Sequence, residues 1–110
     1  MHSDPALVER LSNVLPDMLE PRIMFGGQCW MLNGNMCVGV YKEFLIVRVG
    51  VEVFEKLCAE YDDLRPMDIT GKLMKGWGMI DGAACDNEAL VHLMKESIGF
   101  VETLPKKTSK

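Results

Sequence analysis

The chain has 110 residues, of which 48% are hydrophobic and 25% charged, and its formal net charge is −4 at pH 7. These values fit one globular domain over residues 1–110, with frayed ends at 1–3 and 105–110. No apolar run approaches the roughly 20 residues of a membrane span, and net negative charge disfavours nucleic acid and acidic membranes as partners. The N-terminus lacks a basic region followed by an apolar stretch, so we expect a cytoplasmic protein.

The first half of the chain predicts one helix followed by three strands. The helix begins at Ser3-Asp4-Pro5, where a capping side chain precedes a proline in the first turn, and ends near Leu15. The strands cover residues 22–32, 36–41 and 44–49. Within the first strand, Gly26-Gly27 predicts a bulge or bend. Short connections between these strands predict a β-meander.

The second half predicts a helix, two strands and a final helix. Apolar spacing indicates a helix over 52–61, and Arg65-Pro66 begins an extended segment that a turn at 69–72 joins to a strand over 74–80. The last helix begins at about Asp86 or Asn87 and ends at Thr103, and Gly99 inside it predicts a close approach of another element. The order helix, three strands, helix, two strands, helix predicts a two-layer α+β fold with helices on one face of an antiparallel sheet.

The hairpin around Asn33-Gly34 carries apolar side chains on both predicted faces. Asn-Gly favours a two-residue type I′ turn, which pairs Leu32 with Asn35 and Trp30 with Cys37. That register separates Cys29 from Cys37 and argues against a disulfide. One face then carries Phe25, Cys29, Met31, Met36, Val38 and Val40, and the other carries Gln28, Trp30, Leu32, Cys37 and Tyr41.

A sheet with helices on one side needs only one apolar face, so the second face requires a cover. We predict that Trp30, Leu32, Tyr41 and Trp77 form an interaction face that packs on a protein partner or on a second copy in a homodimer. The alternative is that the first or last helix covers this face inside one subunit. The methionines, among them Met31, Met36, Met79 and Met94, are expected to fill the core.

The residues that could carry chemistry match no catalytic, cofactor or metal pattern. Cys29, Cys37, Cys58 and Cys85 show no zinc spacing, and the glycine pairs are not phosphate loops. His92 is expected to lie at the surface or half-buried. Cys85, just before the last helix, is the one candidate for a reactive thiol with a lowered pKa, and we expect it to be unreactive.

A small basic group lies near Trp77. Arg65, Lys72 and Lys75 could grip single-stranded nucleic acid beside an aromatic ring. The surrounding acidic residues argue against this interpretation; they are Asp62, Asp63, Asp68 and Asp81. We therefore predict that the chain is not an enzyme, has no cofactor or metal, and does not bind nucleic acid.

Five sequence blocks are informative, and the first and the last of them are fairly specific in combination. They are Met24-Phe25-Gly26-Gly27, Leu32-Asn33-Gly34-Asn35-Met36, Arg48-Val49-Gly50, Arg65-Pro66 and Gly71-x-x-Met74-Lys75-Gly76-Trp77. From about residue 7 to residue 104, the chain resembles the N-terminal domain of the TfoX/Sxy competence regulators. The resemblance implies an α+β fold similar to secretion-chaperone-like two-layer proteins. It also implies a regulatory role, since members of that family activate competence genes together with a cyclic-AMP receptor protein.

These observations predict a non-enzymatic regulatory or adaptor module that acts through protein–protein contact. The alternative is a small-molecule-binding domain whose aromatic-lined pocket lies between the sheet and a helix. Trp30, Tyr41 or Trp77 would line that pocket.

Overall fold

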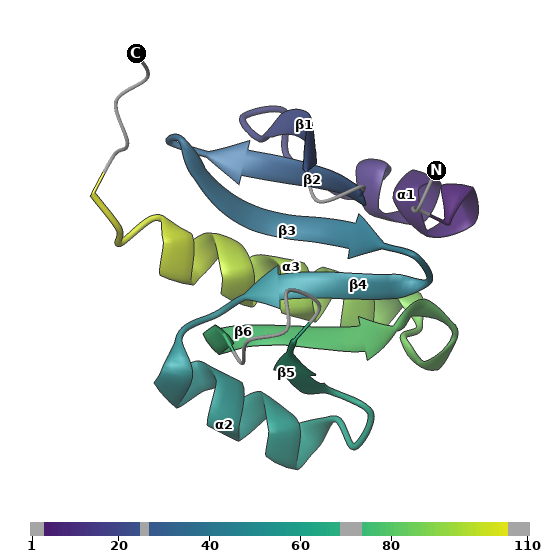
Figure 1. Cartoon of the computed structure of the whole chain (residues 1–110), viewed down its shortest axis with the longest axis vertical. Helices are drawn as coiled ribbons and strands as arrows, with labels where there is room; N and C mark the ends of the chain where they lie inside the picture. The colour runs from purple at the N-terminus through teal and green to yellow at the C-terminus, as the bar shows by residue number, and fades with distance from the viewer. Residues whose placement is uncertain (1–3, 25–26, 69–73, 106–110) are drawn as a thin grey trace.

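The computed structural model describes residues 4–24, 27–68 and 74–105, and these form three α-helices, one short 3₁₀ helix and six strands (Figure 1). In chain order the elements are α1 (Pro5–Ser12), β1 (Glu20–Met24), β2 (Gly27–Leu32), β3 (Asn35–Tyr41), β4 (Phe44–Arg48), α2 (Val51–Glu60), β5 (Arg65–Met67), β6 (Met74–Asp81), η1 (Gly82–Ala84) and α3 (Asn87–Val101).

The six strands form one antiparallel sheet in the order β1-β2-β3-β4-β6-β5. The predicted meander lies at its centre, and β6 pairs with β4 on the far side of it. The edge strands are β1 and β5. Each edge strand contains a proline, Pro21 in β1 and Pro66 in β5, which has no N–H to donate.

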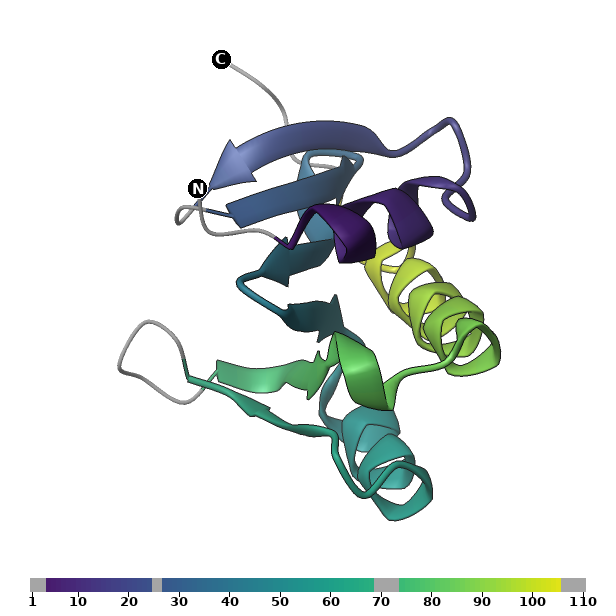
Figure 2. The ribbon, with the colours of Figure 1, turned by 90° about the vertical axis from the view of Figure 1, so that its right-hand side faces the viewer.

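All three helices pack on the same face of the sheet (Figure 2). The core lies between them and the inward side chains of the central strands. Its fully buried members include Leu7 and Leu11 of α1, Leu90 and Leu93 of α3, and Leu45 of β4. The predicted two-layer α+β architecture is therefore confirmed.

Helix ends follow the capping chemistry of the sequence. Asp4 caps α1 by accepting a hydrogen bond from the Ala6 N–H at 3.1 Å, and Asp86 caps α3 by accepting from the Ala89 N–H at 2.8 Å. The first helix ends at Ser12, earlier than the predicted Leu15. Among the described residues, no helix combines the length and apolar character that crossing a bilayer requires.

The expectation for Gly99 is wrong. No heavy atom outside its own helix environment lies within 4 Å of the place where a Cβ would sit, and the residue is exposed on α3. No other element approaches there among the described residues. This glycine therefore weakens the helix without a packing gain.

The predicted first strand is two strands. Met24 pairs with Gly27, so the chain reverses between them, and β1 runs back along β2. A Cβ at Gly27 would lie 2.5 Å from the Val40 carbonyl oxygen, so close packing against β3 excludes a side chain there. The predicted turn at 69–72, Phe25 and Gly26 fall outside the described residues.

The hairpin turn is as predicted, but the pairing beyond it shifts by one residue. Asn33 and Gly34 have φ values of 55° and 81°, as a type I′ turn requires, and Leu32 pairs with Asn35. Trp30 then pairs with Val38, because Cys37 is an extra residue in β3.

This bulge redistributes the side chains of β3 between the two faces. Val38 and Val40 join Trp30, Leu32 and Cys37 on the helix side. Tyr41, predicted to share a face with Trp30, lies on the opposite side.

Candidate functional site

The sheet face opposite the three helices carries a second apolar cluster, and we call this surface the open face. Ile46, Met67 and Met79 are buried at its centre, at 2%, 1% and 3% exposure. Five partly buried side chains pack around them: Met36, Tyr41, Phe44, Met74 and Trp77. The strand register explains the grouping, because Ile46 pairs with Met79 and Arg48 pairs with Trp77, so these side chains share one face.

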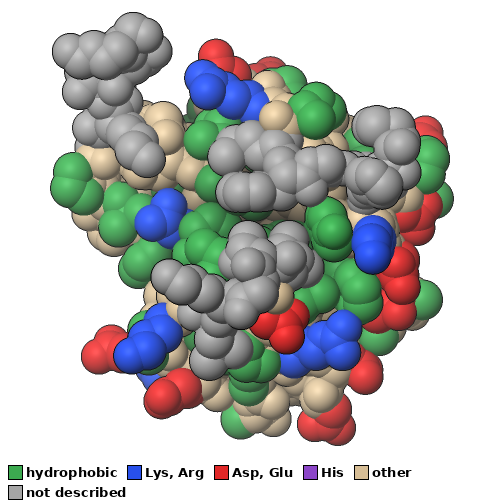
Figure 3. All heavy atoms as spheres, viewed as in Figure 1, with side chains coloured by type: hydrophobic (Ala, Val, Ile, Leu, Met, Phe, Trp, Pro, Cys, Tyr) green, Lys and Arg blue, Asp and Glu red, His purple; other side chains and the backbone are tan. Residues whose placement is uncertain are grey.

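Cationic side chains lie over the aromatic rings of the open face. The distances to the ring centroids are 5.5 Å for Lys42 over Tyr41, 4.9 Å for Arg48 over Trp77 and 4.9 Å for Arg65 over Phe44. Figure 3 shows hydrophobic side chains on this face, with Lys and Arg side chains around them and Asp or Glu side chains beside several of these cations. These distances lie within the range of cation–π attraction, so positive charge gathers at the rim of the apolar cluster.

The structure separates the four residues predicted to form one interaction face. Trp30 and Leu32 lie in the core beneath the helices, at 6% and 5% exposure, whereas Tyr41 and Trp77 lie on the open face. The predicted grouping is therefore wrong for Trp30 and Leu32. Cys37 is an extra residue in β3, and it moves Tyr41 to the face opposite Trp30. The alternative, that a helix covers the Trp30 side within one subunit, is confirmed.

Sequence reasoning did not assign Phe44, Met67 and Arg48 to this surface. A signal for two of them was present in β4, where Phe44, Ile46 and Arg48 alternate with Leu45 and Val47. That alternation places Phe44 and Arg48 on the same side, away from the helices. Of the basic group near Trp77, Arg65 lies over Phe44, Lys75 is exposed, and Lys72 lies outside the described residues.

A small pocket opens at the Arg48 end of the open face, where β4 leads into α2. Its volume is about 280 Å³. Arg48, Lys75 and Trp77 line it on the sheet side, and Val51 and Phe100 line it on the helix side. Gly50, with φ of 87°, passes against the Phe100 ring, where a Cβ would lie 2.7 Å from the ring carbons.

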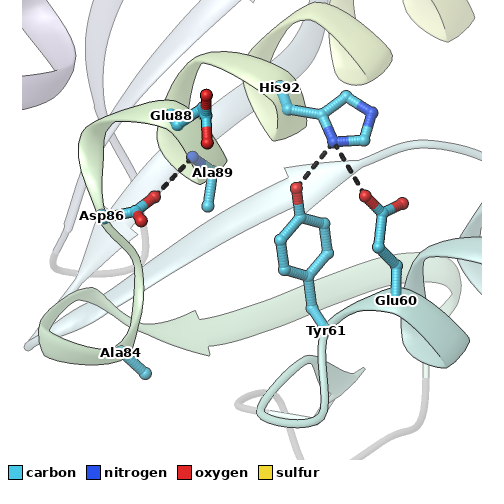
Figure 4. Close-up of a pocket in the computed structure, with 7 residues that line it drawn as sticks. All are labelled: Glu60, Tyr61, Ala84, Asp86, Glu88, Ala89 and His92. Atoms are coloured by element: carbon cyan, nitrogen blue, oxygen red, sulfur yellow. Dashed lines mark hydrogen bonds and ion pairs between the residues drawn. The ribbon is translucent and has the colours of Figure 1, made fainter.

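The second hollow is a cleft of about 490 Å³ between the end of α2 and the start of α3 (Figure 4). Tyr61 and His92 face each other across it, with 2.7 Å between the phenolic oxygen and Nδ1. The His92 Nε2 lies 3.3 Å from a Glu96 carboxylate oxygen, and Glu60 approaches Nδ1 at 3.9 Å. The Glu96 carboxylate, the His92 imidazole and the Tyr61 phenol therefore form a chain of contacts.

The electrostatics of this cleft disfavour nucleophilic or basic use of the tyrosine. Burial raises the pKa of Tyr61. The negative charge of neighbouring carboxylates, above all that of Glu60, raises it further. An activated phenol requires a lowered pKa. The contact therefore serves to join α2 to α3, and His92 is half-buried as expected.

The cysteines are all free, as the argument against a Cys29–Cys37 disulfide predicts. Burial raises the pKa of the Cys85 thiol to about 11, although Arg10 nearby partly opposes this. Burial also raises the pKa of Cys37 to about 12. The expectation of an unreactive Cys85 agrees with this direction, because thiolate is the reactive form.

The described part of the chain contains no cluster of three or more His, Cys, Asp or Glu side chains placed to hold a metal ion. Comparison with protein-family profiles, with curated proteins and with solved structures found no match.

Proposed function

We propose that this domain is a regulatory or adaptor module that binds another protein through the open face. The observation that carries the proposal is a ring of partly buried apolar side chains around the buried Ile46, Met67 and Met79, on a sheet face where no described helix packs; the ring consists of Met36, Tyr41, Phe44, Met74 and Trp77. Antiparallel sheets with helices on one side present a polar opposite face to water. A clustered apolar face in that position is typical of an interaction surface.

The composition of the open face supports a polypeptide as the occupant. Aromatic residues, methionine and arginine are the types enriched at protein interfaces. Methionine has an unbranched side chain that adapts to different partner shapes, and four of the eight residues in this cluster are methionines: Met36, Met67, Met74 and Met79. The resemblance to the N-terminal domain of competence regulators supports the same kind of role.

The charge of the open face favours a different protein over a second copy of this chain. Two copies packed face to face would bring their own Lys42, Arg48 and Arg65 near one another, and like charges at an interface are unfavourable. The whole chain has a net charge of −4, and acidic side chains, the exposed Asp68 among them, also lie near this face, so the positive charge is local to the three cations that lie over the rings. We therefore propose an acidic partner, and self-association is the competing outcome of the test.

The test compares capture by wild type, by Trp77→Ala and by the control Met18→Ala in lysate of the native host. Met18 is 54% exposed and lies outside the open-face cluster, so its substitution removes apolar surface of another region. We expect a protein set that wild type and Met18→Ala retain and Trp77→Ala loses, measured by quantitative mass spectrometry. Identical sets for all three proteins would refute binding through this face.

Light scattering at high micromolar concentration measures the molar mass in solution and so tests whether two copies of the chain associate. We expect the mass of one chain. A dimer that Trp77→Ala dissociates would replace the proposed heterologous partner with self-association.

The pocket lined by Trp77 and Phe100 gives the small-molecule alternative a specific location between sheet and helix. A thermal-shift screen against metabolites tests it, because a ligand that binds only the folded state raises the melting temperature. We expect no rise, since about 280 Å³ is below the roughly 300–1,000 Å³ of most ligand pockets.

A further inference from the structure

We propose that the pocket at the Arg48 end of the open face is a subsite for a carboxylate, and that it receives an Asp or Glu side chain of the partner segment. This inference rests on the proposed function, because it names the chemistry of the segment that the open face binds. The apolar cluster supplies contact area for neighbouring side chains, and the pocket supplies the charge recognition.

The pocket carries positive charge that no described side chain compensates. Arg48 and Lys75 both line it, and in the described part of the chain neither has a carboxylate within 4 Å. Exposed lysines without partners are ordinary, but Arg48 is half-buried. A partly buried cation gains most from an anion that replaces lost water.

The Arg48 guanidinium has two neighbours that orient it. It lies 4.9 Å from the Trp77 ring centroid, and Nη1 donates a long hydrogen bond of 3.4 Å to the Met36 carbonyl oxygen. A guanidinium has five N–H donors in a planar fork, so most remain available. A pre-positioned fork matches the two oxygens of a carboxylate.

The backbone of the pocket adds no competing oxygen from a capping side chain. Helix α2 begins here with Gly50 as its N-cap, and no side chain accepts a hydrogen bond from its first turn. Ser, Thr, Asp or Asn is the usual residue at this position. The acidic Glu52 also lies in this first turn, and its exposed side chain is not among those that line the pocket.

The size and the surroundings of the pocket fit a single acidic side chain. A volume of about 280 Å³ suits one side chain better than a complete cofactor. Trp77 belongs both to the pocket and to the open-face cluster, so the pocket is continuous with the apolar surface. A segment that places an acidic residue beside apolar or aromatic residues satisfies both regions.

The experiment selects peptides from a random 12-residue display library on the full chain, followed by anisotropy titrations with synthetic versions of the enriched peptides. We expect enrichment of Asp or Glu next to apolar residues. Replacing the acidic residue by its amide should weaken binding to wild type about tenfold, as the loss of a charge-assisted contact predicts. Amidation of the peptide C-terminus should leave the affinity unchanged.

Matched variants assign the effect to the pocket. Lys75→Gln alters an exposed side chain and should keep the fold, and it should weaken the acidic peptide several-fold while binding the amide peptide as wild type does. Lys56→Gln, an exposed position on α2 outside the pocket, is the control with unchanged affinity. Arg48→Gln should show a larger loss, with circular dichroism confirming its fold.

The outcomes separate this inference from the proposed function. Enriched peptides that depend on Trp77 but lack acidic residues, or whose binding ignores Lys75→Gln and Arg48→Gln, overturn the carboxylate subsite and leave the open-face proposal intact. Peptides that bind independently of Trp77→Ala, or no enrichment at all, overturn both.

Discussion

The placement of the two tryptophans on opposite faces makes a quantitative prediction about Trp30→Ala and Trp77→Ala. Trp30 is 6% exposed beneath the helices, whereas Trp77 is partly exposed on the open face. A buried tryptophan removes about 200 Å² from water, which at about 25 cal/mol per Å² corresponds to an upper bound near 5 kcal/mol. Measured truncations of this kind cost about 3–5 kcal/mol.

The expected cost of Trp77→Ala is smaller, at about 1–2 kcal/mol. It loses part of its apolar contact and the interaction with Arg48, and such cation–π contacts contribute about 0.5–2 kcal/mol. A domain of this type has a total stability of roughly 5–15 kcal/mol. Trp30→Ala should therefore shift the urea midpoint far more than Trp77→Ala does.

Urea unfolding followed by far-ultraviolet circular dichroism measures both variants without relying on tryptophan emission. Equal denaturant slopes would show that each variant unfolds between comparable states. Acrylamide quenching gives an independent readout, because Trp30→Phe leaves only the accessible indole and Trp77→Phe leaves only the protected one. A cost for Trp77→Ala that equals or exceeds that of Trp30→Ala would refute the assignment of faces.

Further substitutions test the backbone, the caps and the thiols. Gly50→Ala should destabilise the domain by about 2 kcal/mol or more in urea titrations, because its φ of 87° and the adjacent phenyl ring both oppose a Cβ. Gly99→Ala, on the exposed side of α3, should instead stabilise it by about 0.5–1 kcal/mol in the same assay. Asp86→Ala should lower stability by about 1 kcal/mol, since the cap of α3 is lost, which thermal melts will show. Stability should fall as the pH rises above about 9, because an unfolded Cys85 thiol ionises near 9.0 and the folded thiol only near about 11.

Each of these substitutions has an outcome that would contradict the structural reason given for it. The thiol contributes stability fully below pH 9 and loses it on the way to about pH 11, with a slope of up to about 1.4 kcal/mol per pH unit for each such group. Cys85→Ala should reduce that slope, and an unchanged slope would contradict the argument. The two glycine substitutions control for each other, so a loss of stability at Gly99 would count against its exposed position. An Asp86→Ala melt equal to wild type would contradict the cap.

Most of the element order was predictable because its signals are local, but the division of the predicted first strand into β1 and β2 was not. Asn33-Gly34 specifies its turn through positive φ, Asp86 is a capping residue at the start of an apolar helical stripe, and Pro66 marks an edge strand. Each signal depends on a few neighbouring residues. Gly26-Gly27 was ambiguous, since glycine suits a bulge and a reversal equally well.

The assignment of faces was not predictable in the same way. Met36, Cys37 and Val38 are all apolar, so the sequence pattern does not show which of them is the extra residue in β3. A one-residue shift moves every later side chain to the opposite face. The Tyr61–His92 contact joins residues 31 positions apart, and neither residue carries a local signal of the other.

The two outer strands constrain how any partner can attach. Pro21 and Pro66 each deprive a border of the sheet of an amide hydrogen, and β5 is only three residues long. A visiting chain therefore finds no continuous main-chain ladder to extend on either flank. If the proposed partner binds through side chains on the broad surface instead, its specificity depends on residue identity and is open to change by single substitutions.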